Sequence, residues 1–275
     1  MGRAKILLIL TMLVLASGCV TQLEQTNQQN TSTQTNTPGQ NVPPGPETPP
    51  LPPPAQPNSP DKGALGSLNH GYLRAEPYKN IIIEIDYISG YEPTSATKSA
   101  LSDFFQNVAG KSVTFAGGNM IATTKSVYTV SDLVATEKAN RRYYTTGDTA
   151  VVYMMFLNGQ YESAGALGVA FKASTAALFV ERINDATSAL VLYAQIEKAV
   201  AVHELGHLMG LVNINYASER PHEDPQHKGH SSNQDSVMFW AVEDITINTI
   251  LNFGPPGEFD SDDLFDLQKI KDEVY

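Results

Sequence analysis

Alternating apolar and polar stretches along the chain predict one folded domain over residues 65–275. β-Branched or apolar runs, most of them bounded by glycine, predict strands at 80–88, 111–115, 149–157, 168–173 and 177–182. Helical spacing predicts helices over 94–108, 131–143, 187–209 and 260–274. The order β-α-β-α-β-β-β-α indicates an α/β (α+β) fold, a mixed twisted sheet with helices on it and an irregular C-terminal part that ends in a helix.

The first 19 residues have the pattern of an export signal. A short positive start is followed by an apolar run over residues 6–15, too short for an ordinary transmembrane helix. The run ends in Leu-Ala-Ser-Gly-Cys, which resembles the lipobox of prokaryotic lipoproteins. Cys19 is the only cysteine, so it has no internal disulfide partner, and we expect it to be lipidated. A plain signal peptide or an uncleaved anchor is the alternative; under each of these readings the rest is exported.

Residues 20–64 are predicted to be a tether. Their first half is mostly Thr, Gln and Asn, and their second half is rich in proline. Such a segment buries too little apolar surface to offset the entropy lost on ordering. The proline run should be extended and stiff, holding the domain away from the membrane.

The net negative charge of the chain limits the kinds of molecule that it is expected to bind. The formal net charge is −11 and the chain has no basic patch, which argues against nucleic-acid binding. We expect a monomer at the cell surface, anchored to the outer face of the cytoplasmic membrane by its N-terminal lipid, or else secreted.

The most informative motif is His203-Glu204-x-x-His207. Two histidines four residues apart lie on one face of a helix, so their imidazoles can share one metal ion. Glu204 is rotated by about 100° from His203, within reach of a water at that metal. The apolar stripe of the same helix continues through both histidines, which places the site on the face packed against the sheet. The alternative is a helix whose histidines merely belong to a buried stripe.

A catalytic zinc needs three protein ligands and one open position. Gly210 stands where the helix should stop and lets the chain turn sharply below the metal. The sequence resembles the metzincin clan of zinc peptidases, although Asn213 occupies the position of that clan's third histidine.

Further along the chain, His230-Ser231, four residues, Ser236, Val237 and Met238 match the spacing of the archaemetzincin family, with serine at both cysteine positions. This resemblance covers residues 203–240 closely. It implies a metzincin-like domain, His230 as the third ligand after an inserted loop, and Met238 as the methionine turn below the metal. Because serines replace the cysteines of the family's structural zinc site, we expect one Zn²⁺, the catalytic ion.

Other ligands remain open from the sequence. His227, His222 or a carboxylate such as Asp224 could replace His230. His222 and His227 could also hold a second metal with Glu223 or Asp224. Tyr216 is a conceivable further donor at the active site.

These residues predict a zinc metallopeptidase, with an endopeptidase favoured over an aminopeptidase, acting on a peptide or protein substrate. Glu204 would be the general base, and the strand at 168–172 would either bind an extended substrate or be an ordinary buried strand. Two alternatives are a catalytically inactive zinc-binding lipoprotein that acts as a binding module, and a substrate-binding lipoprotein of a transporter. The second leaves the His-Glu-x-x-His motif unexplained.

Overall fold

The computed structural model describes residues 59–163, 165–189, 191–243 and 254–273. The predicted signal sequence, Cys19 and the tether up to residue 58 lie outside the described residues. Within the described ranges, no helix has both the length and the apolar character needed to cross a membrane.

A five-stranded sheet in the order β2-β1-β4-β7-β6 forms the centre of the fold. Its strands are β1 (Asn80–Tyr87), β2 (Ser112–Met120), β4 (Thr149–Leu157), β6 (Gly168–Lys172) and β7 (Thr175–Phe179). All neighbours pair in parallel except β6, which is antiparallel to β7 and forms one edge. Two short strands, β3 (Val127–Tyr128) and β5 (Gln160–Tyr161), make a separate small sheet. The predicted α/β class with a mixed sheet is confirmed.

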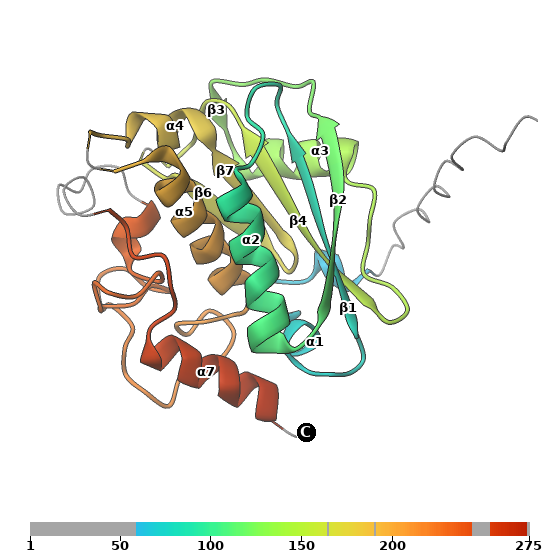
Figure 1. Cartoon of the computed structure of the whole chain (residues 1–275), viewed down its shortest axis with the longest axis vertical. Coiled ribbons are helices and arrows are strands. Elements are labelled where there is room, and N and C mark those ends of the chain that lie inside the picture. Colours follow the sequence, from blue (N-terminus) through green and yellow to red (C-terminus); the bar gives the residue numbers. More distant parts are fainter. Residues whose placement is uncertain (1–58, 164, 190, 244–253, 274–275) are drawn as a thin grey trace, which may run out of the picture. The chain divides into compact units, whose positions relative to one another are not determined.

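Helices cover both faces of the large sheet (Figure 1). They are α1 (Asn69–Leu73), α2 (Ser95–Asp103), α3 (Val130–Asn140), α4 (Val180–Asp185), α5 (Tyr193–Leu208) and α7 (Ser261–Asp272). A π-helical turn, Phe104–Ala109, continues α2, and two 3₁₀ turns span Pro60–Lys62 and Trp240–Glu243. Helices α2 and α5 lie side by side on one face, with α3 on the other (Figure 1).

Strand β4 shows why helices must pack on both faces of the large sheet. Its residues alternate between two hydrophobic clusters, with Val152, Met154 and Phe156 in the larger cluster and Tyr153 and Met155 in the smaller. Because successive side chains of a strand point to opposite faces, an uninterrupted apolar strand requires packing on both sides. The larger cluster includes α5, so the histidine-bearing helix is fixed directly on the sheet.

Several predicted boundaries are wrong. Strand β2 does not end before Gly117 but continues to Met120, because Gly117 lacks a Cβ and can lie against the Ile85 carbonyl. Helix α3 is capped by Thr129 through a capping box, a few residues before the predicted cap, Ser131 or Asp132. The predicted strand over 177–182 is β7 followed by α4, and the predicted helix over 187–209 begins only at Tyr193.

A buried ion pair joins the start of the packed region to the sheet. Asp61 and Arg141 are almost fully buried, and the Arg141 Nη2–Asp61 Oδ1 distance is 2.9 Å. Ser59 and Thr145 also donate hydrogen bonds to the Asp61 carboxylate. Packing therefore includes residues upstream of the predicted domain start at residue 65.

Candidate metal centre

Helix α5 carries the two histidines and the glutamate of the predicted metal motif. His203, Glu204 and His207 are all buried, and the two imidazole centroids are 4.7 Å apart with the rings perpendicular. The four-residue spacing on a helix sets this geometry.

The chain leaves α5 through a left-handed turn and returns with His230. Gly210 has φ 76°, and its carbonyl accepts hydrogen bonds from the amides of Asn215 and Tyr216. A Cβ at Gly210 would lie 2.9 Å from Asn215 Cβ, so the close approach also requires glycine. The ring centroid of His230 is 5.2 Å from that of His203 and 4.9 Å from that of His207.

The three histidines meet the chemical requirement for a metal site. One ring nitrogen from each of His203, His207 and His230 can be chosen so that all lie within 4.8 Å of one another. Three imidazoles are a known donor set for a catalytic zinc with an open position. The donor type and the spacing therefore fit a zinc ion.

The orientation of His203 is fixed by a backbone group. Its Nδ1 lies 2.7 Å from the carbonyl oxygen of Val237. A backbone carbonyl is an acceptor, so Nδ1 carries the proton and Nε2 is the nitrogen that a metal would use. The carbonyl of Val237 is a contribution that the sequence does not reveal, because any residue type supplies one.

Met238 packs against the same helix. It is fully buried, and a Cβ built on Gly206 would lie only 2.2 Å from its sulfur. The glycine inside the motif therefore allows the segment carrying Val237 and Met238 to approach α5. Phe259 also approaches Gly206.

Glu204 faces the edge strand. A Cβ built on Gly168, the first residue of β6, would lie 2.5 Å from Glu204 Oε1 and 3.0 Å from its Cδ. The Glu204 carboxylate thus lies against the backbone of the strand that forms the sheet edge. The sequence marked Gly168 only as the start of a strand that could bind substrate, and it did not reveal the close approach of Gly168 to Glu204.

The other candidate ligands have different partners. His227 stacks on Trp240 with centroids 3.9 Å apart and faces Asp224, while His222 lies 3.0 Å from Asp266. Asn213 is exposed and accepts a hydrogen bond from Ser218.

The other positions singled out in the sequence pack in the core or form hydrogen bonds within the fold. Tyr216 belongs to the main hydrophobic cluster. Ser236, at a position where the archaemetzincin pattern has cysteine, donates a hydrogen bond to Asp263. Ser231 is fully buried, and its hydroxyl accepts from the amide of Asn233.

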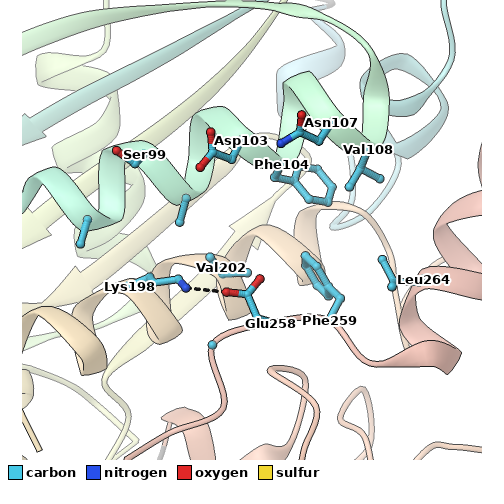
Figure 2. Close-up of a pocket in the computed structure, with 13 residues that line it drawn as sticks. Ser99, Asp103, Phe104, Asn107, Val108, Lys198, Val202, Glu258, Phe259 and Leu264 are labelled. Atoms are coloured by element: carbon cyan, nitrogen blue, oxygen red, sulfur yellow. Dashed lines mark hydrogen bonds and ion pairs between the residues drawn. The ribbon is translucent and has the colours of Figure 1, made fainter.

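A cavity of about 460 Å³ lies elsewhere, between α2, α5 and the segment before α7 (Figure 2). Lys198 and Glu258 form an ion pair at its wall, 2.6 Å apart. None of the three clustered histidines lines it, and neither does Glu204. The cavity is therefore separate from the metal centre.

No protein-family model matches the chain, and no curated protein matches it. Among solved structures, the crystal structure of archaemetzincin (AmzA) from Methanopyrus kandleri is similar, with 15% sequence identity and a TM-score of 0.46. The alignment covers 70% of this chain and 96% of that chain. At these values the likeness assigns no function to this chain.

Proposed function

We propose that this chain is a zinc-dependent peptidase, exported and tethered to the membrane through a lipid on Cys19. One observation carries the catalytic part of the proposal. His230, from a loop that follows α5, lies against the two histidines of the helix, with a glutamate beside them on the same helix. A helix with two incidentally buried histidines gives no reason for a third to be placed there.

In this proposal His203, His207 and His230 hold the ion. A bound zinc ion supplies a Lewis acid that acidifies water and polarises a carbonyl group. Glu204 accepts a proton from the attacking water and delivers it to the amine nitrogen as the peptide C–N bond breaks. Its burial and the close backbone of Gly168 limit the space in which the carboxylate can move.

The edge strand supports a peptide as the substrate. Strand β6 is at the end of the sheet order, it is only partly buried after Gly168, and it begins beside Glu204. An extended peptide can pair with such an edge through main-chain hydrogen bonds. That pairing would bring a scissile bond past Glu204 and the histidines.

The central test is Glu204→Gln in the full chain, purified in mild detergent. The variant should keep its zinc and cleave an unstructured protein roughly 10²–10⁴-fold more slowly, because the proton acceptor is lost. The exposed Glu92→Gln is the matched control and should leave cleavage unchanged. Equal rates for Glu204→Gln and the parent would remove Glu204 from the mechanism. Zinc binding by the parent without any chelator-sensitive cleavage would favour the inactive binding module instead.

The ligand assignment has its own test. His230→Ala should lose one zinc ion per chain relative to the parent, whereas His227→Ala should lose none, because His227 stacks on Trp240. The opposite result would move the third ligand to His227.

The membrane tether is tested separately with Cys19→Ala. If Cys19 carries the lipid, the parent chain should partition into detergent and the variant should not mature to the lipidated form. Identical partitioning of the two proteins would contradict lipidation and leave the peptidase proposal untouched.

A further inference from the structure

A second cluster of potential metal ligands lies between the loop after α5 and the start of α7. One ligand atom from each of His222, Asp260 and Asp263 can be chosen so that all lie within 4.8 Å of one another. The side chains of His222 and Asp263 are 4% and 0% exposed, and Asp260 is partly exposed. The cluster shares no residue with the histidine centre described above.

The contact between His222 and Asp263 is incomplete as it stands. His222 Nε2 lies 3.0 Å from Asp266 Oδ2, so Nε2–H donates to that carboxylate. In the neutral ring, Nδ1 then presents a lone pair toward Asp263 Oδ1, which is 3.7 Å away and is also an acceptor. Neither of these two buried atoms has a hydrogen-bond partner among the described residues.

The 3.7 Å distance between His222 Nδ1 and Asp263 Oδ1 distinguishes a hydrogen bond from a metal bridge. It is too long for a hydrogen bond, so a proton on Nδ1 would not be shared well at this distance. Two ligand atoms that each lie about 2.1 Å from one tetrahedral ion are about 3.4 Å apart. The spacing is therefore close to that of two atoms bridged by a cation.

The negative charge of the cluster also favours a bound cation. Asp263 and Asp266 are fully buried, and Asp260 adds a third carboxylate at the rim. Arg220 lies nearby in sequence, but its guanidinium pairs with Asp262 instead. His222, when protonated, supplies one positive charge against these three carboxylates, so much of their negative charge is left uncompensated, which is unfavourable.

We propose that His222, Asp260 and Asp263 bind a second divalent metal ion, of the zinc class, that fastens the loop to α7. The pair Asp266–His222 has the arrangement in which a carboxylate orients a metal-binding imidazole. An imidazole among carboxylates favours zinc or a similar transition metal over calcium or magnesium, which prefer oxygen ligands alone. Asp260 keeps its α7 capping bonds through Oδ1, and its exposure gives the ion a route from solvent.

The second ion would also brace the catalytic centre, and this part alone rests on the proposed function. The Ser236 hydroxyl donates to Asp263 Oδ2 at 2.5 Å and accepts from the Met238 amide at 2.8 Å. Between these residues lies Val237, whose carbonyl orients His203. Fixing Asp263 therefore fixes the turn that sets the ring of His203.

The number of metal ions bound per chain tests the proposal. The full chain, stripped with a chelator and dialysed against Zn²⁺, should hold about two ions by elemental analysis. His203→Ala/His207→Ala should hold about one, and adding His222→Ala should remove it. A parent chain with one ion, or a double variant with none, would overturn the proposal and identify His222 as an imidazolium held by Asp263 and Asp266.

The alanine variants could unfold, which circular dichroism would reveal. Two more conservative variants therefore test the same site. Asp260→Asn keeps a good helix cap but loses a charged ligand, and Asp266→Asn keeps the shape of the orienting group. Each should weaken the second zinc roughly 10-fold or more while the first remains bound. Unchanged affinity in both would refute the site. A chain that holds two ions yet cleaves nothing would refute the peptidase and leave this site standing.

Discussion

Gly168→Ala tests whether the edge strand fixes the position of the catalytic carboxylate. The added methyl carbon would lie 2.5 Å from Glu204 Oε1 and 2.8 Å from Val200 Cγ1. Ordinary contacts are about 3.5 Å, so the carboxylate would have to move by about 1 Å. Strand β6 is held to β7 by its ladder and α5 is packed in the core, so the side chain of Glu204 is the part that yields.

The expected effect falls on turnover rather than on metal binding. A misplacement of about 1 Å in a reacting group can cost about 10²-fold in rate, or about 2.7 kcal/mol in the barrier. We therefore expect kcat to fall roughly 100-fold with zinc content unchanged, because His203, His207 and His230 do not contact Gly168 in this way.

The assay is steady-state cleavage of a fluorogenic peptide, together with zinc analysis and a thermal melt. Gly257→Ala is the matched control: the nearest atom to its added carbon would be Lys198 Nζ at 3.4 Å, the end of a flexible side chain. It should leave kcat unchanged. A Gly168→Ala protein with the parent's kcat would show that Glu204 is not held by this strand, and a loss of zinc would show that the damage is to the fold.

Two further predictions concern stability. Gly206→Ala should destabilise the fold by about 1–3 kcal/mol through its clash with Met238, and adding Met238→Ala should cost less than the sum of the single changes; additive urea-unfolding energies would contradict the contact. Asp61→Asn should cost about 3 kcal/mol at neutral pH because Arg141 stays buried, whereas the exposed Glu76→Gln should cost under about 1 kcal/mol. Burial raises the pKa of Asp61, but the Arg141 charge and the hydrogen bonds outweigh it and lower the pKa below 3.8. The contribution of Asp61 is thus complete above pH 3.8 and lost as the pH falls through the lower folded value, so the parent and Asp61→Asn should converge in acid. Parallel stability curves down to pH 2 would refute this.

The sequence alone was enough for features set within a few residues. The i, i+4 spacing of His203 and His207 places both rings on one helix face whatever the rest of the chain does. The apolar run of β4 predicts a strand buried on both faces, and Gly210 takes the left-handed conformation that ends the helix region. The α/β class followed from the order of such elements.

Boundaries were less predictable where distant residues decide them. Gly117 looked like the end of a strand, yet β2 continues through it because β1 lies close enough to pair with it. The cap of α3 depends on which of several polar residues reaches the free amides, and Thr129 does so together with Asp132.

The position of the third histidine relative to the helix pair is visible only in the tertiary structure. The resemblance to the archaemetzincin spacing favoured His230 as the third ligand, but His222 and His227 lie in the same polar stretch and stayed open as alternatives. In the fold, Asp266 of α7 orients His222 and Trp240 stacks on His227, while only His230 lies against the helix pair. The partners that separate these three rings are up to 44 residues away from them in sequence, so the choice depends on the path of the loop and on the packing of α7.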